Sequence, residues 1–172
     1  MRAFVTVGST KFDDLVQHSL KEEVLLSLRN EGYTNLAVQC GNSSFEFASV
    51  VADGGEHALE RAGVSVEVWK FKPSLEEEFD KADLVISHAG AGTILDVLRK
   101  GKRLIVVPNE TLLDNHQSEL AVALEEKGHL KSSTVTGLAQ TIEDVHKVNL
   151  TPFPPFDGHK FAGILDETMG FL

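Results

Sequence analysis

Short apolar runs alternate with longer amphipathic stretches along most of the 172-residue chain. Five of the apolar runs are rich in Val, Ile, Leu and Phe and are bounded by Gly, Pro, Ser or Asn, which predicts strands. The predicted strands are Ala3–Val7, Asn35–Cys40, Val64–Phe71, Asp83–Ser87 and Arg103–Val107. Because these runs are almost continuously apolar, we expect a mostly parallel sheet that is buried on both faces.

The stretches between the predicted strands carry apolar residues at helical spacing. Leucines and valines from Leu15 to Leu28 form one such stripe, and Ser74 and Glu77 have the spacing of a capping box. The predicted helices are Asp14–Glu31, Gly55–Ala62, Ser74–Lys81, Thr93–Lys100, Asn115–Lys127 and Leu138–Lys147. This alternation indicates an α/β fold, a doubly wound and Rossmann-like domain with right-handed connections.

The end of the chain has a different pattern. The TPFPPF stretch from Thr151 to Phe156 predicts a stiff extended connector. After it, four apolar residues from Phe161 to Met169 recur at helical spacing and predict a short helix over Lys160–Leu172. We therefore divide the chain into a domain over residues 1–150 and a connector with a terminal helix over residues 151–172. The apolar face of that helix needs a surface, either on its own domain or on a partner.

Composition and charge disfavour several classes of protein. The chain is 42% hydrophobic and 24% charged, which is typical of a soluble globular domain. Its net charge of −10 would repel nucleic acid, so no nucleic-acid partner is expected. No segment approaches the ~20 apolar residues of a membrane helix, so no direct membrane span is expected. The single cysteine, Cys40, is expected to be a small buried hydrophobe, which fits a reducing, cytoplasmic compartment.

A glycine-rich turn, HAGAGT, joins the strand Asp83–Ser87 to the helix that follows. Its glycines let the backbone approach a diphosphate, and the amides and dipole of the helix start supply positive potential. Asp96 lies one helical turn past Gly92, where its carboxylate can accept hydrogen bonds from ribose hydroxyls. We interpret His88, immediately before the turn, as a ligand contact; the alternative is a hydrogen-bonded histidine at a strand end.

Two further loops should meet this turn, because ligands of open α/β sheets bind beyond the carboxyl ends of the strands. Gly8–Thr10 follows the first strand and offers backbone amides and two hydroxyls. Asn115–Gln117 starts a helix, where an N-cap with solvent-facing neighbours is an equal alternative. Asp13 and Asp14 are interpreted as helix caps, because the pair lacks the strand-end setting of a metal-diphosphate site.

A dinucleotide site is disfavoured by the details of the turn. The sequence GAGTIL is not a full G-x-G-x-x-G, and it follows the fourth strand instead of the first. The next strand ends in LIVVPNE, without an acid at its tip. We therefore expect no cofactor and no metal, and a nucleotide sugar as the ligand.

Four segments together resemble the catalytic subunit of the two-chain UDP-N-acetylglucosamine transferase of dolichol-linked oligosaccharide synthesis. They are FVTVGSTKFDDLV, ISHAGAGT, VPN and DNHQSELA, and the resemblance spans nearly the whole chain. That subunit family is similar in turn to the donor-binding C-terminal lobe of B-type, two-lobed glycosyltransferases. The resemblance implies that this chain is a single donor-binding lobe.

The resemblance also implies a role for each loop. The glycine turn with its histidine and the first loop would hold the diphosphate, and Phe71 would lie against uracil with the backbone of Lys72 at its edge. Asp96, usually Glu in bacterial relatives, would hold the ribose, while His116 and Gln117 would read the sugar. The residues expected to contact UDP-GlcNAc are Gly8, Ser9, Thr10, Phe71, Lys72, His88, Gly90, Ala91, Gly92, Thr93, Asp96, Asn115, His116 and Gln117.

The resemblance finally implies that the chain is half an enzyme. A membrane-anchored, acceptor-binding subunit would present dolichol-diphosphate-GlcNAc at the cytosolic face of the endoplasmic reticulum, and it would supply the general base. The reaction would invert the anomeric centre, with His88 and helix amides stabilising the leaving UDP. Two alternatives stay open: a nucleotide-sugar-binding module without catalysis, and a subunit of a split bacterial exopolysaccharide transferase.

Overall fold

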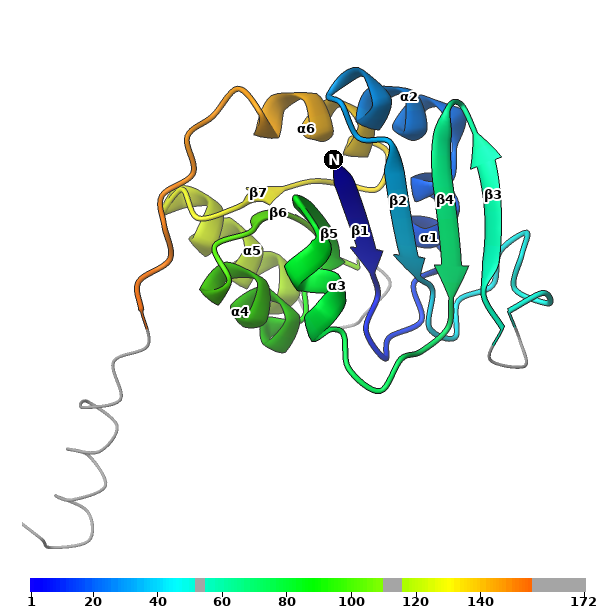
Figure 1. The fold of residues 1–172 in the computed structure, drawn as a ribbon. Coiled ribbons are helices and arrows are strands. Elements are labelled where there is room, and N and C mark those ends of the chain that lie inside the picture. The colour runs from blue at the N-terminus through cyan, green and yellow to red at the C-terminus, as the bar shows by residue number, and fades with distance from the viewer. Residues whose placement is uncertain (52–54, 110–115, 156–172) are drawn as a thin grey trace, which may run out of the picture.

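A seven-stranded, mostly parallel sheet forms the centre of the computed structural model, which describes residues 1–51, 55–109 and 116–155 (Figure 1). The strand order is β3-β4-β2-β1-β5-β6-β7, and β3 alone is antiparallel to its neighbour. The strands are β1 (Arg2–Thr6), β2 (Asn35–Gln39), β3 (His57–Arg61), β4 (Val64–Trp69), β5 (Leu84–His88), β6 (Arg103–Val107) and β7 (Lys131–Ser132). All five predicted strands are confirmed, although β4 ends at Trp69, two residues before its predicted end.

The predicted helix Gly55–Ala62 is wrong, because this segment contains the edge strand β3. Arg61 pairs with Val64, so β3 and β4 form a hairpin with a two-residue turn. Both turn residues, Ala62 (φ 52°) and Gly63 (φ 72°), have the positive φ that such turns require. Pairing with β4 therefore outweighs the helical propensity of the sequence HALER.

The described ranges contain six helices, and one predicted helix is divided. They are α1 (Asp13–Ser19), α2 (Glu22–Asn30), α3 (Glu76–Lys81), α4 (Ala91–Arg99), α5 (His116–Glu126) and α6 (Leu138–Val145). The predicted Asp14–Glu31 helix breaks because Lys21 has an extended backbone (ψ 147°), and the Ser19 hydroxyl donates to the Val16 carbonyl at 2.8 Å. The apolar stripe continues across the break because α1 and α2 pack against the same core.

Both capping interpretations are also wrong. The N-cap of α3 is Leu75; Ser74 Oγ accepts the Glu76 N–H at 3.1 Å, and Glu77 forms an ion pair with Lys81. The N-cap of α1 is Phe12, without a side-chain cap. Asp13 instead accepts the N–H of Ser44 at 2.8 Å and so holds the loop after β2, while Asp14 is exposed in the first turn.

The sheet is covered on both faces by helices. Helices α1, α2 and α6 pack on one face around a core that includes Leu25, Val38 and Ile142, and α3, α4 and α5 pack on the other around Phe4 and Leu104 (Figure 1). Cys40 is fully buried, as predicted. Among the described residues, no helix combines the length and apolar character needed to cross a membrane.

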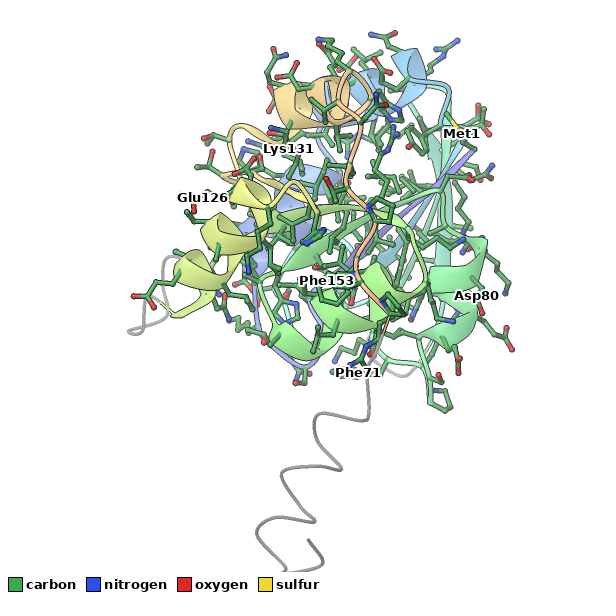
Figure 2. All side chains as sticks on the ribbon, turned by 90° about the vertical axis from the view of Figure 1, so that its left-hand side faces the viewer. Met1, Phe71, Asp80, Glu126, Lys131 and Phe153 are labelled. Atoms are coloured by element: carbon green, nitrogen blue, oxygen red, sulfur yellow. The ribbon has the colours of Figure 1, made fainter. Side chains whose placement is uncertain are left out.

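The chain after α6 runs back along the domain before the described part ends. The Thr151 N–H donates to the Gly128 carbonyl at 2.8 Å, and the ring of Phe153 lies 5.2 Å from that of His129 (Figure 2). Residues 151–155 form neither helix nor strand. Phe156 and the predicted helix Lys160–Leu172 lie outside the described residues.

Candidate functional site

Four loops leave the sheet at the carboxyl end of its parallel strands, the lower edge in Figure 1. They follow β1, β4, β5 and β6, and they carry most of the residues that the sequence predicts for the site. The topology therefore brings together groups that are separated by about a hundred residues in the sequence, as expected for an open α/β sheet.

The ring of His88 joins two of these loops. His88 is the last residue of β5 and is 7% exposed. A Cβ on Gly8 would lie 2.8 Å from His88 Cε1, and a Cβ on Gly90 would lie closer still to His88 Nε2. Both glycines are therefore required because the imidazole fills the space beside them, and Gly8 also has a positive φ of 59°.

Burial lowers the pKa of His88 below its ordinary value of 6.5, and the Thr6 backbone opposes this effect in part. The ring is therefore neutral at physiological pH and carries one N–H donor. Its Nδ1 atom is buried and makes no hydrogen bond of ordinary geometry. The structure thus places a neutral imidazole at the glycine turn.

The N-terminus of α4 faces open space beside His88. Gly90 is the N-cap, the first turn contains no acidic residue, and Ala91 and Gly92 are exposed. A Cβ on Gly92 would meet no atom within 4 Å. Because the first backbone N–H groups of a helix lack intrahelical acceptors, this end of α4 presents donors and a positive dipole to an anion.

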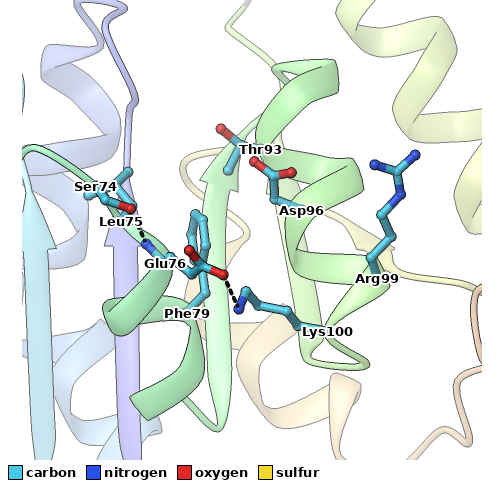
Figure 3. Close-up of a pocket in the computed structure, with 8 residues that line it drawn as sticks. All are labelled: Ser74, Leu75, Glu76, Phe79, Thr93, Asp96, Arg99 and Lys100. Atoms are coloured by element: carbon cyan, nitrogen blue, oxygen red, sulfur yellow. Dashed lines mark hydrogen bonds and ion pairs between the residues drawn. The ribbon is translucent and has the colours of Figure 1, made fainter.

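A groove of about 600 Å³ runs between α3 and α4 (Figure 3). Thr93 and Asp96 line it from α4, and Lys100 lies at its far end, 2.7 Å from Asp80. The Asp96 side chain is exposed and has no hydrogen bond or ion pair to another described residue. Its carboxylate is therefore available to accept hydrogen bonds from a ligand, at the position predicted for a ribose contact.

The loop after β4 presents an exposed aromatic ring at the same edge. Phe71 is 52% exposed, so one face of its ring is open to solvent or to a ligand (Figure 2). The residues beside it are held in place: Lys70 O accepts the Gly41 N–H at 3.2 Å, and Lys72 Nζ lies 3.0 Å from Glu78 and 3.8 Å from the centre of the Trp69 ring. The loop thus offers one ring on a fixed backbone.

The side chain of Lys72 belongs to a structural ion-pair cluster. Glu78 is 3% exposed and lies 2.7 Å from Arg2 Nη2 and 3.0 Å from Lys72 Nζ. Burial works against the charge on Lys72, but the hydrogen bond and charge of Glu78 raise its pKa overall. The side chain of Lys72 is thus engaged within the chain, and the contact of its backbone with uracil stays a prediction.

The third predicted loop is described in part. Asn115 lies outside the described residues, and His116 is placed only as the first residue of α5. Gln117 Oε1 accepts the Asn109 N–H at 3.2 Å, so the bond uses the amide oxygen and not the Nε2 group. Asn109, 4% exposed, also donates to the Lys11 carbonyl at 3.4 Å, and so it connects this loop to the first one.

Sequence reasoning missed the buried amides that connect the loops, Gln39 and Asn109. Gln39 is 1% exposed and bonds to Thr6, Gly8 and Lys70. The available signal was a polar amide at the end of an apolar strand, a position where a buried side chain needs partners. Within the described ranges, no three His, Cys, Asp or Glu side chains gather as a metal site would require.

Known proteins resemble this chain in sequence. The Glycosyltransferase family 28 C-terminal domain matches residues 2–167. The UDP-N-acetylglucosamine transferase subunit ALG13 of Homo sapiens is 44% identical over 176 residues, a match that covers 95% of this chain and 15% of the human protein. The chain therefore spans a small part of that relative's length.

Two solved structures share the fold. A solution NMR structure of ALG13 is 30% identical with a TM-score of 0.68, and the match covers 98% of this chain and 96% of that one. The crystal structure of MurG from Acinetobacter baumannii is 22% identical with a TM-score of 0.62, and the match covers 85% of this chain and 40% of that one. The fold is that of the C-terminal lobe of B-type glycosyltransferases, as predicted.

Proposed function

The chain belongs to the glycosyltransferase family 28 C-terminal domain family, and from this premise we propose that it is the donor-binding subunit of a UDP-N-acetylglucosamine transferase. The name of the human relative, a UDP-N-acetylglucosamine transferase subunit, supports both the donor and the need for a second chain. The donor would bind across the four loops at the carboxyl edge of the sheet.

One observation carries the proposal: three groups suited to the three parts of UDP stand along one edge. The exposed ring of Phe71 is suited to stack on uracil, and the unpaired carboxylate of Asp96 to accept from the ribose hydroxyls. The open N-terminus of α4, beside His88, is suited to the diphosphate. Gln117 Nε2 and the start of α5 would contact the sugar, together with Ser9 and Thr10 of the first loop.

The proposed chemistry is an inverting displacement. A hydroxyl oxygen of the acceptor forms a bond to the anomeric carbon while the bond from that carbon to the UDP oxygen breaks, and the acceptor proton passes to a base on the partner. Negative charge grows on the diphosphate as the bond breaks. The α4 amides are fixed before the reaction, so they stabilise that charge without reorganisation, and His88 would donate its one N–H. No metal is needed in this scheme.

The acceptor would come from the second chain. We propose a membrane-anchored partner that presents dolichol-diphosphate-GlcNAc at the cytosolic face of the endoplasmic reticulum, so that transfer adds the second sugar of the lipid-linked precursor. The support is the family resemblance in ISHAGAGT, VPN and DNHQSELA and the match to a C-terminal domain family, which supplies one lobe only.

The test is transfer of labelled N-acetylglucosamine from UDP-GlcNAc to dolichol-diphosphate-GlcNAc. The reaction is run with this chain alone, with membranes depleted of it, and with the two combined. Activity in the mixture alone is the expected result. A folded chain that binds UDP but gives no transfer in any combination would favour a nucleotide-sugar-binding module, and transfer to a bacterial polyprenyl acceptor alone would favour the exopolysaccharide alternative.

A further inference from the structure

Gln39 ends β2, the strand that lies between β1 and β4 in the sheet. Its side chain therefore reaches the loops on both sides. Gln39 Nε2 donates to the Gly8 carbonyl at 2.8 Å and to the Lys70 carbonyl at 2.7 Å, and Gln39 Oε1 accepts the Thr6 hydroxyl at 2.6 Å. A single buried amide thus connects the loop after β1 with the loop after β4.

The chemistry of the partners fixes the orientation of this amide. The Gly8 and Lys70 carbonyl oxygens can only accept hydrogen bonds, so the NH₂ group must face them and both of its protons are used. The Thr6 hydroxyl donates to Oε1 and itself accepts the Gly8 N–H at 3.1 Å. The arrangement leaves no rotational freedom to the Gln39 side chain, because every polar atom of the amide has a partner.

We propose that Gln39 is a positioning residue for donor binding, which sets the distance between the diphosphate loop at Gly8 and the uracil ring contact at Phe71. The proposal rests on the function proposed above. The base and the diphosphate of UDP are separated by a ribose of nearly fixed size. The two loops must therefore lie at a matching distance from each other before both can contact the nucleotide. Holding the loops in advance removes an ordering cost from binding.

Phe71 shows how the effect would be transmitted. Lys70, held by Gln39 and by the Gly41 N–H, directly precedes Phe71, and Lys72 is held by Glu78 on the other side. The exposed ring is therefore placed by bonds to its two neighbours. Without the amide of Gln39, the Lys70 carbonyl keeps one of its two donors, and the Gly8 carbonyl loses the Gln39 donor.

The test compares Gln39→Met with Tyr33→Phe in the transfer assay with partner membranes. Methionine keeps the shape of the side chain and loses its three hydrogen bonds. Tyr33 precedes the same strand at its other end, is also buried, and loses only its bond to His146. We expect Gln39→Met to raise the KM for UDP-GlcNAc by about tenfold with little change in kcat, because the lost term is uniform binding. Tyr33→Phe should leave KM unchanged.

A double-mutant cycle with Phe71→Ala separates positioning from general destabilisation. Phe71→Ala should raise KM clearly in the wild-type chain and by a smaller factor in the Gln39→Met chain, because an unheld ring contributes less. Equal factors in both chains, or a normal KM in Gln39→Met, would overturn the proposal while leaving the proposed function intact. An inactive wild-type mixture would instead refute the proposed function.

A measurement on the wild-type chain covers the case in which Gln39→Met does not fold. In NMR spectra the side-chain NH₂ protons of Gln39 should exchange slowly with solvent and shift when UDP is added, because both of their acceptors lie in loops that bind it. Slow exchange with a shift supports the proposal. Resonances that stay unchanged at saturating UDP overturn it.

Discussion

Polar side chains at the two edges of the sheet differ in how they are paired. At the amino edge, Tyr33 Oη lies 3.0 Å from His146 Nε2, and Arg103 donates to His146 Nδ1 at 2.7 Å. At the carboxyl edge, His88 Nδ1 is buried without a hydrogen bond, and Asp96 has no partner among the described residues. The exposed carboxylate of Asp96 and the open N-terminus of α4 therefore offer hydrogen-bonding groups to a ligand at the carboxyl edge.

This difference indicates that residues important for stability and residues available for binding lie at opposite ends of the strands. At the amino edge, Tyr33, His146 and Arg103 bond to one another in the free protein, so changes to these residues should affect unfolding alone. Under the proposed function a nucleotide binds at the carboxyl edge, so changes there should affect binding, and they should affect unfolding only where the change also disturbs packing. The predictions below test that separation.

The largest effect is expected for Asp96→Ala. Two charge-assisted hydrogen bonds to ribose would be lost, each worth ~1.5–3 kcal/mol, so kcat/KM for UDP-GlcNAc should fall by about a hundredfold or more. The melting temperature should not change, because Asp96 has no partner to lose among residues 1–51, 55–109 and 116–155. Asp144→Ala is the control, an acid on α6 whose ion pair with Lys147 at 2.9 Å is exposed and contributes little. A similar loss of transfer in both variants would contradict the ribose assignment.

A pair of glycine substitutions should give opposite results at the start of α4. Gly90→Ala places a methyl group against His88 Nε2, so it should lower the free energy of unfolding by about 1–3 kcal/mol and weaken UDP binding as the ring moves. Gly92→Ala meets no atom in the free chain, so its stability should be unchanged or higher. If Gly92→Ala nevertheless weakens UDP binding, the ligand approaches that backbone closely. Denaturant unfolding measures the change in stability, and calorimetry measures the change in affinity for UDP.

The smallest effect concerns pH at the amino edge. Burial, then the charge of Arg103, lowers the pKa of His146 below 6.5, its ordinary value. The unfolded chain therefore binds more protons between the folded pKa and 6.5, and the free energy of unfolding should fall as pH falls through that window and be fully regained above it. Urea unfolding between pH 5 and 8 measures the slope.

The geometry at His146 explains the direction of this shift. Arginine can only donate, so Nδ1 of His146 accepts from Arg103 and the ring proton is on Nε2, toward Tyr33. Protonating Nδ1 would place its N–H against the N–H of Arg103, so that two donors face each other without an acceptor. His146→Gln should flatten the pH slope in part and leave the KM for UDP-GlcNAc unchanged. His88 contributes in the same direction, so a slope that is identical in His146→Gln would assign the whole effect to the carboxyl edge.

Much of the fold follows from the sequence because its strands are apolar and uninterrupted. The runs around Val5, Val38 and Ile86 are buried on both faces, and no helix could accommodate them as well. The segment HALER was predicted wrongly because it becomes a strand only by pairing with β4 through the turn at Gly63. The helical propensity of its own residues carries no information about that pairing. The break at Lys21 was missed because apolar spacing is the same for two helices that face one core.

The site was predicted in part for a related reason. The glycine turn and Asp96 are local features, and the sequence contains their spacing. The bonds of Gln39 to Gly8 and of Asn109 to Lys11 join segments 31 and 98 residues apart, and only the folded sheet brings them together. The sequence also suggested that the glycines serve the ligand, whereas Gly8 and Gly90 first serve the ring of His88.

That packing couples the side chains allowed at positions 8 and 90 to the presence of the His88 ring. A side chain at Gly90 is incompatible with the imidazole but compatible with a smaller residue in its place, so His88→Ala should restore the stability that Gly90→Ala removes. A side chain at position 90 would therefore require loss of the histidine first, whereas Gly8 stays constrained by its positive φ of 59° in either case. A chain without the histidine gains the space to vary the shape of the turn after β5.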